Sequence, residues 1–137
     1  MVGAIAAVNA VGGIYHPDSH QILAGARRED GQGFRDMMAA IMVGYRVVTS
    51  PGSNTTIGVV ATNVPSSKAD LSKIALMAHD CFARGINPAH SMSDGDTIFT
   101  LSSGKASSAR ADVSAIGTIA ATVVAHAVVQ AESLTGH

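Results

Sequence analysis

The sequence predicts an α/β fold built in layers within one domain. Its 137 residues suffice for a single hydrophobic core, and no internal repeat divides them. Apolar, β-branched runs of strand length occur at 2–11, 55–62 and 97–102, and segments with apolar residues at helical spacing lie between and after them. Buried strands that alternate with amphipathic helices indicate layers of sheet and helix.

The first half of the chain is predicted to hold a long strand, a short strand and a helix. Residues 2–11 form a nearly continuous apolar run that ends at a Gly-Gly pair, which predicts a strand covered on both faces. Residues 14–26 contain a Pro-Asp-Ser turn and are expected to form a loop with a short strand. Apolar residues at three- and four-residue spacing predict a helix over 34–48. Small residues at 49–54 then predict a turn.

The second half opens with a predicted central strand at 55–62, because its residues are β-branched and apolar. Ser67 followed three residues later by Asp70 is a capping-box pattern, so a helix is expected to start there. Gly85 is the expected end of that helix.

A third strand at 97–102 and a long helix over 111–132 complete the predicted fold. The longest apolar run, 113–129, falls within this helix. Four polar residues interrupt the run, and it barely reaches the length that spans a bilayer. A buried helix is therefore the preferred interpretation, and no membrane contact is expected.

The amino-acid composition indicates which classes of binding partner to expect. Charged residues make up 14% of the chain, against roughly 25% in an average soluble domain, so the surface is expected to be covered by a partner. The net charge of -1 and the absence of Trp argue against nucleic acid. The single Cys81 cannot form an internal disulfide, which fits a reducing cytoplasm.

No metal or other cofactor is expected. His16 and His20 lie four residues apart, which would suit a metal site on a helix, but Pro17 favours a turn. Cys81 continues an apolar stripe and is expected in the core. The Ser-Ser-Gly-Lys sequence at 102–105 lacks the first glycine of a phosphate-binding loop.

Asn54 and Thr55 stand at the junction of the predicted turn and the central strand, where they suit one kind of chemistry. A hydroxyl becomes an effective nucleophile when a base lies beside it, and a nucleophile at the start of its own chain has its α-amine as that base. This amine titrates at about 8, so it can accept and return a proton near neutral pH. Attack of the Thr55 hydroxyl on the Asn54 carbonyl would create such a terminus through an ester that water hydrolyses. An ordinary loop that enters an ordinary strand is the alternative.

Three further residues carry chemistry that the sequence alone leaves open. Asn9 is the only amide in the first predicted strand, and it is either a hydrogen-bonded core group or a donor to an oxyanion. Asp94 and Asp96 flank Gly95 at the entrance of the third strand, where alternation would point both carboxylates to the same side. They either belong to a hairpin turn or hold the terminal ammonium group of Thr55.

Three separated segments resemble the DmpA-type aminopeptidases, a family of self-cleaving N-terminal-nucleophile hydrolases. The segments read VNAVGGIYHPDSHQILAGAR, SNTTIGVVATNV and GINPAHSMSDGDTIFTLS in that order, and the resemblance runs from Val2 to the C-terminal helix. Within the family, NTTI, VVATN and DGDT look most like the hydrolases of nylon (aminohexanoate) oligomers. Family members carry a long segment before the first strand, whereas this chain enters that strand within a residue or two of Met1. An N-terminal portion, which supplies further catalytic side chains, is therefore expected to be missing.

The resemblance also implies a fold and a processing site. The expected fold is part of a four-layer αββα sandwich, usually assembled into homo-oligomers, with residues 1–137 as a single partial hydrolase domain. Self-cleavage between Asn54 and Thr55 would give the chains 1–54 and 55–137.

In the site that the resemblance implies, Thr55 is the nucleophile, Asn9 is the oxyanion-hole amide, and Asp94 and Asp96 form the acidic pair. The implied substrate is a small amide, peptide or ester with a free amine, hydrolysed through an acyl group on Thr55. The alternative is a catalytically incomplete fragment that serves as an oligomerisation or interaction module.

Overall fold

The computed structural model describes residues 1–47, 54–92, 94–106 and 112–135, and it contains two small sheets and four helices within them. The larger sheet has the strand order β1-β4-β6 and the smaller one has the order β3-β2-β5. In chain order the elements are β1 (Val2–Ala7), β2 (Gly13–Tyr15), β3 (Ile22–Ala24), α1 (Met37–Met42), β4 (Ile57–Thr62), α2 (Lys68–His79), α3 (Phe82–Gly85), β5 (Ile86–Asn87), β6 (Thr97–Ser102) and α4 (Val113–Thr135).

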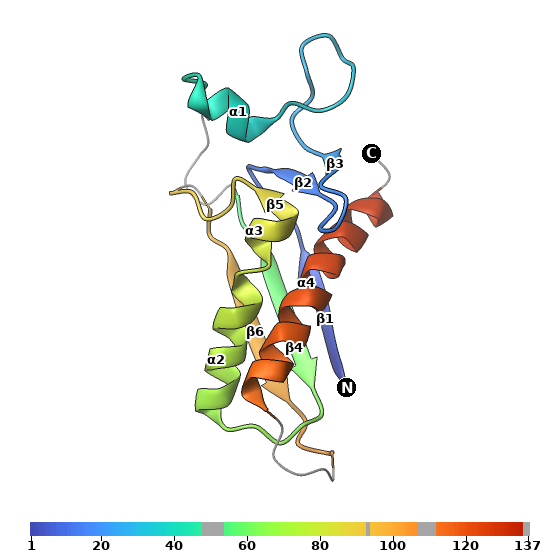
Figure 1. Cartoon of the computed structure of the whole chain (residues 1–137), viewed down its shortest axis with the longest axis vertical. Coiled ribbons are helices and arrows are strands. Elements are labelled where there is room, and N and C mark those ends of the chain that lie inside the picture. The colour runs from blue at the N-terminus through green and yellow to red at the C-terminus, as the bar shows by residue number, and fades with distance from the viewer. Residues whose placement is uncertain (48–53, 93, 107–111, 136–137) are drawn as a thin grey trace.

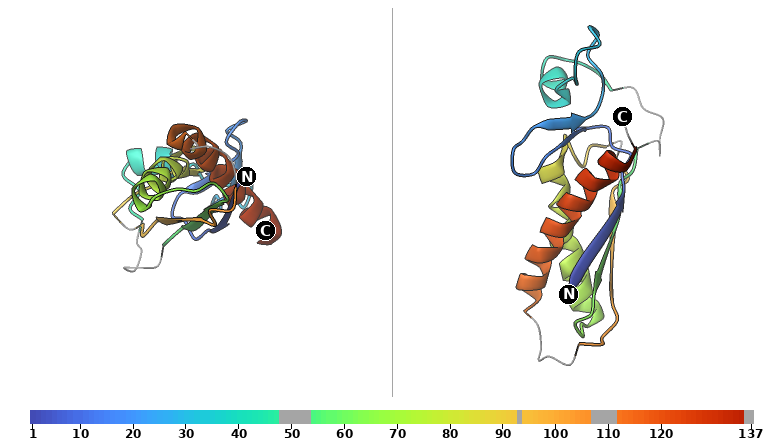
Figure 2. Two further views of the ribbon diagram at one scale, coloured as in Figure 1. Left: turned by 90° about the horizontal axis from the view of Figure 1, so that it is seen from below. Right: turned by 90° about the vertical axis from the view of Figure 1, so that its right-hand side faces the viewer.

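The larger sheet is covered by helices on one face only. Its central strand β4 pairs antiparallel with β1 and parallel with β6. Helices α2 and α4 lie side by side across one face of this sheet, and the two views of Figure 2 show the strands on the opposite side. The smaller sheet and α1 lie beyond one end of the larger sheet (Figure 1). The predicted layering of sheet and helices is confirmed.

The core lies between the larger sheet and its two long helices. Phe82, Ile74 and Val60 are fully buried there, as are Val124 and Val128 of α4. Small residues let the helices approach closely, because an added Cβ at Gly117 of α4 would run into the Met77 side chain of α2. The core therefore depends on alternating large and small side chains along α2 and α4.

The prediction that the first strand is covered on both faces is wrong for this chain. Burial in β1 alternates residue by residue, and Ile5 is 70% exposed. On the same outer face, Phe99 of β6 is 58% exposed, and the register aligns both residues with Val59 of β4. Because α2 and α4 cover only the inner face, the outer face keeps an apolar row in contact with solvent.

Two predicted helix boundaries also differ from the structure. The helix predicted over 34–48 spans only Met37–Met42, because Gly44 adopts a φ of +95° just after it, and residues 48 and 49–53 lie outside the described part of the chain. The helix expected to end at Gly85 ends at His79, and α3 follows as a separate turn. This break lets both Cys81 and Phe82 reach the core.

Helix α4 is long and apolar enough, over Val113–Leu134, to cross a membrane by length and composition. In this structure it instead packs against β1 and α2, with Ala120, Val124 and Val128 fully buried. The core helix of a soluble protein meets the same criterion, so the feature alone is weak evidence for a membrane.

The capping box predicted at the start of α2 is confirmed. The Ser67 hydroxyl accepts from the Asp70 N–H at 3.2 Å, and the Asp70 carboxylate accepts from the Ser67 N–H at 3.0 Å. We expect Ser67→Ala to lower the free energy of unfolding by about 1 kcal/mol, because the Asp70 N–H loses the hydroxyl that accepts its hydrogen bond. Urea denaturation followed by circular dichroism measures this. The matched control is Ser72→Ala in the same helix, whose exposed hydroxyl bonds only the Lys68 carbonyl, and equal midpoints for the two variants would contradict the expectation.

Candidate active site

The topology of the larger sheet brings three separated segments to one of its ends. Since β1 runs antiparallel to β4, the residues after β1 lie beside the residues before β4. Since β6 runs parallel to β4, the residues before β6 meet them there as well. This end of the sheet therefore holds Asn9, the Asn54-Thr55 junction, and the loop with Asp94 and Asp96.

Backbone hydrogen bonds hold the junction from both sides. The Thr55 N–H donates to the Asn9 carbonyl at 2.9 Å. The Gly95 N–H donates to the Asn54 carbonyl at 3.0 Å, and Asn54 forms a parallel bridge with Asp94. The peptide bond between Asn54 and Thr55 thus has its N–H bonded to one neighbouring segment and its C=O bonded to the other.

The Thr55 hydroxyl is hydrogen-bonded to the carbonyl group that it would attack in the predicted self-cleavage. Its Oγ1 donates to the Asn54 carbonyl oxygen at 2.7 Å, in a partly buried position. The strand predicted from Thr55 begins only at Ile57, because the Thr55 N–H bonds Asn9 and the Thr56 N–H bonds a side chain. Thr55 therefore sits in an irregular turn just outside the regular ladder.

Asp96 is the buried carboxylate of the site. Its side chain is 5% exposed, and Oδ1 accepts from the Thr56 N–H at 2.8 Å. Its Oδ2 lies 3.6 Å from His90 Nδ1, an ion pair when that imidazole is protonated. The Asp96 carboxylate therefore holds the backbone of Thr56, the residue that follows Thr55.

Asp94 takes a different partner. Its Oδ2 accepts from the Ser91 N–H at 2.8 Å, and its own N–H donates to the Ser91 carbonyl at 3.0 Å. This reciprocal pair joins Asp94 to Ser91, whereas the hairpin turn that was the alternative for Asp94 and Asp96 does not form, because β5 and β6 lie in different sheets. A catalytic role for the Asp94 carboxylate stays a prediction.

Asn9 lies two residues beyond the end of β1 and is exposed, so the expectation that it belongs to a buried strand is wrong. Its backbone carbonyl accepts from Thr55. Asn9 also lines a pocket of about 310 Å³, together with Arg27, Phe34 and Glu132. The oxyanion role of the Asn9 amide stays a prediction.

Two histidines that sequence reasoning did not select lie beside Asp96. The His79 Nε2 is 3.2 Å from the Asp96 carbonyl oxygen, and the His79 and His90 rings stack with centroids 4.4 Å apart. The signal for His90 was its place in the same motif as Asp96, NPAHSMSDGD. His79 had no comparable signal, because it reaches Asp96 only through the packing of α2 on β6.

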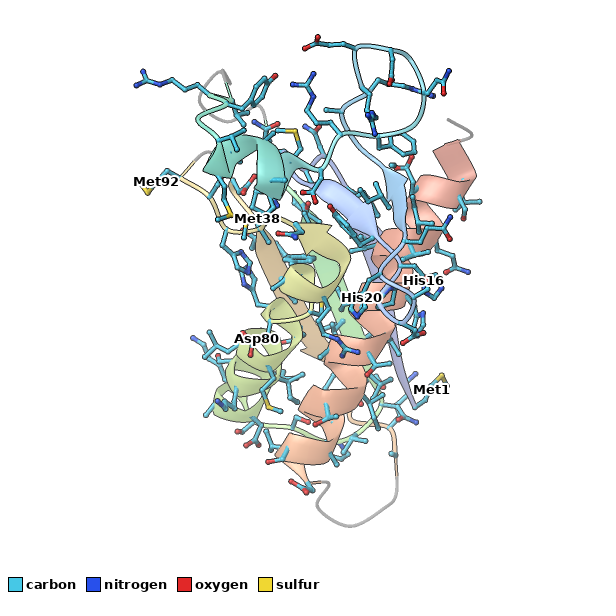
Figure 3. The ribbon with its side chains drawn as sticks, turned by 45° about the horizontal axis from the view of Figure 1, so that its top comes forward. Met1, His16, His20, Met38, Asp80 and Met92 are labelled. Carbon is cyan, nitrogen blue, oxygen red and sulfur yellow. The ribbon has the colours of Figure 1, made fainter. Side chains whose placement is uncertain are left out.

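The residues discounted for metal or redox chemistry have structural roles. Figure 3 shows His16 and His20 in the loop between β2 and β3, where His16 Nδ1 accepts from the N–H groups of Asp18 and Ser19 at 3.3 Å. This confirms the turn interpretation. Cys81 is 1% exposed, and burial raises the pKa of its thiol to about 12, so it is a core residue, as predicted.

The fold and the junction define an α/β protein with a threonine hydroxyl hydrogen-bonded to the preceding carbonyl group, and comparison with known proteins identifies its family. The family model for peptidase family S58 matches residues 1–137. The chain belongs to this family, the DmpA family that the three motifs resemble.

Individual relatives match over shorter segments. An uncharacterised aminopeptidase of Mycobacterium leprae is 47% identical over 75 residues, which cover 53% of this chain and 21% of the relative. A 6-aminohexanoate-oligomer endohydrolase of Paenarthrobacter ureafaciens is 44% identical over 54 residues, which cover 39% of this chain and 15% of the relative. The matched segments therefore span about a fifth or less of the length of these relatives.

Proposed function

We propose that this chain is the nucleophile-bearing part of an autoprocessing N-terminal-nucleophile amide hydrolase. The observation that carries the proposal is the Thr55 hydroxyl, held 2.7 Å from the oxygen of the Asn54 carbonyl. Hydrogen bonds on both sides fix the Asn54-Thr55 peptide bond in place, so the reacting groups are already oriented.

The proposed self-cleavage is an acyl shift followed by hydrolysis. The Thr55 Oγ1 forms a bond to the Asn54 carbonyl carbon, and the bond from that carbon to the Thr55 nitrogen breaks. The hydroxyl proton ends on the liberated nitrogen, which becomes the α-amine of a new chain. Water then hydrolyses the ester, which regenerates the hydroxyl and leaves Asn54 with a carboxylate.

In the proposed turnover, the freed amine of Thr55 is the base for its own hydroxyl. The carbonyl of Asn9, which bonds this nitrogen in the uncut chain, supports the same position after cleavage. Asp96 supplies a negative charge one residue away, and Asp94 and the Asn9 amide complete the proposed site.

The proposed substrates are small amides, peptides or esters with a free amine. The names of the relatives, aminopeptidase and 6-aminohexanoate-oligomer endohydrolase, support amide substrates. The proposal includes no metal or other cofactor, and the buried Cys81 thiol is compatible with a cytoplasmic location.

The finer fold that we propose is the four-layer αββα sandwich. The apolar outer face of the larger sheet, with Ile5, Ile57 and Phe99 exposed, supports a second sheet packed on it and assembly into homo-oligomers. The same face also favours the second candidate function, an interaction module without catalysis. The two candidates differ in what becomes of the Asn54-Thr55 bond.

Mass spectrometry of the purified chain separates these candidates. The hydrolase proposal predicts two fragments, 1–54 and 55–137, that accumulate together during incubation near neutral pH. It also predicts hydrolysis of amino-acid amides or of 6-aminohexanoate oligomers by the cleaved protein. A chain that stays intact and hydrolyses neither substrate would support the interaction module instead.

A further inference from the structure

Gly95 donates a backbone hydrogen bond to the carbonyl of Asn54, the group that the proposed self-cleavage would attack. Its N–H donates to the Asn54 oxygen at 3.0 Å, across from the loop that enters β6. The Thr55 hydroxyl bonds the same oxygen at 2.7 Å. When Oγ1 turns from this oxygen to the adjacent carbon, it ceases to donate, and the oxygen gains negative charge as the new bond forms. The Gly95 N–H is then a donor that is already in place for that charge.

Gly95 is also the residue type that leaves room for the nucleophile. A Cβ at position 95 would lie 2.8 Å from the Thr55 Oγ1, whereas its next contacts would be ordinary ones at 3.7 and 3.8 Å. The φ angle of Gly95 lies outside the left-handed region, so alanine fits the backbone conformation here. The space beside the hydroxyl therefore requires glycine at this position, whereas the conformation of the Asp-Gly-Asp turn does not.

We propose that Gly95 is a catalytic residue of the self-cleavage step: its N–H binds the oxyanion at the Asn54 oxygen, and its missing side chain lets the Thr55 hydroxyl reach the Asn54 carbon. During the attack, the π-electron pair of the carbonyl moves to the oxygen that Gly95 holds. On collapse, this pair re-forms the carbonyl, the bond to the Thr55 nitrogen breaks, and the nitrogen takes the hydroxyl proton. The inference rests on the proposed self-cleavage at this bond.

The same donor serves the turnover of an external substrate. The acyl carbonyl of that substrate must occupy the place of the Asn54 carbonyl, because Thr55 attacks both from the same position. Its developing oxyanion then meets the Gly95 N–H. A substitution at position 95 therefore affects both reactions, whereas a substitution that acts only on the precursor affects self-cleavage alone.

The first test is the rate of self-cleavage of Gly95→Ala, followed by intact mass over time. We expect the rate to fall by about 10²-fold or more, because the added Cβ would lie 2.8 Å from the Thr55 Oγ1 and would displace the hydroxyl from the Asn54 carbon. The matched control is Gly3→Ala in β1, where an added Cβ meets open space and the rate should equal that of the wild-type chain. Thermal unfolding followed by circular dichroism shows whether each variant is folded.

The second test removes the N–H without adding a side chain. Incorporation of glycolic acid at position 95 converts the Asp94-Gly95 amide into an ester, and we expect self-cleavage to slow by about 10-fold or more. A wild-type rate in either folded variant overturns the inference, and if Gly95→Ala does not fold, the ester variant decides. If the wild-type chain cleaves itself and the variants do so at the same rate, the inference about Gly95 fails and the proposed function stands. A wild-type chain that never cleaves overturns both.

Discussion

We expect Thr55→Val to leave the chain uncut under conditions in which the wild-type chain, by the proposed reaction, separates into 1–54 and 55–137. Valine keeps the branched shape of threonine and removes only the hydroxyl that lies 2.7 Å from the Asn54 carbonyl oxygen. Without this nucleophile neither the ester nor a new α-amine forms, so both self-cleavage and hydrolysis of amides are lost. Intact-mass measurements and an amidase assay on the same sample detect both losses.

Thr56→Val is the matched control for this experiment. The Thr56 hydroxyl is fully buried and has no hydrogen-bond partner among the described residues, although its backbone N–H bonds Asp96. Valine at position 56 keeps that backbone bond, so self-cleavage should continue. Cleavage that survives in Thr55→Val would show that another group, such as the Asn54 side-chain amide, breaks the bond.

The second large effect is expected for Asp96→Asn. Asparagine keeps an oxygen that can accept from the Thr56 N–H at 2.8 Å, but it removes the negative charge beside the nucleophile. If that charge stabilises the terminal ammonium group of Thr55, amide hydrolysis by the cleaved protein should fall by about 10²-fold with little loss of stability. The turnover number and the thermal midpoint, measured on the same preparation, test this.

A second substitution of Asp96 and a control substitution of Asp80 distinguish the effect of the Asp96 charge from its effect on the backbone. Asp96→Ala also removes the acceptor and leaves the buried Thr56 N–H unpaired, so it should lower the free energy of unfolding by about 1–3 kcal/mol as well. Asp80→Asn, an exposed carboxylate just after α2, should change neither quantity. Wild-type turnover in Asp96→Asn would show that Asp96 acts only by holding the backbone.

The elements that local chemistry defines could be predicted from the sequence. Three of the six residues in the run TIFTLS are β-branched, and the run forms β6 with the predicted bounds. Ser67 and Asp70 fix the start of α2 by bonds within one turn. The long helix also forms, from Val113 to Thr135, because its apolar stripe meets the larger sheet.

Features that depend on tertiary packing could not be predicted from the sequence. The periodicity of 34–48 suits a helix, but the conformation of Gly44 ends it after Met42. The apolar run of β1 indicates two covered faces, whereas which face a neighbour covers depends on tertiary structure. Sequence order alone does not show that His79 meets Asp96, since the contact requires α2 to lie on β6.

The candidate site shows the same division. The resemblance to the DmpA family selected Thr55, Asp94, Asp96 and Asn9, and the strand order brings their segments to one end of the sheet. The contribution of Gly95 could not be predicted, because glycine has no side-chain functional group that would mark it as a candidate. The hydrogen bond from its N–H to the Asn54 carbonyl follows only from the pairing of β6 with β4.

Trapping of the ester with hydroxylamine tests the central claim most directly. Hydroxylamine at neutral pH attacks esters in preference to amides, and the chain has no Asn-Gly pair at which this reagent commonly cuts. We predict that the wild-type chain, treated during self-cleavage, yields fragment 1–54 with a hydroxamate at the carbonyl of Asn54 and fragment 55–137 with a free amine. A fragment 1–54 that ends only in the free acid, at every hydroxylamine concentration, would contradict an acyl shift to the Thr55 hydroxyl.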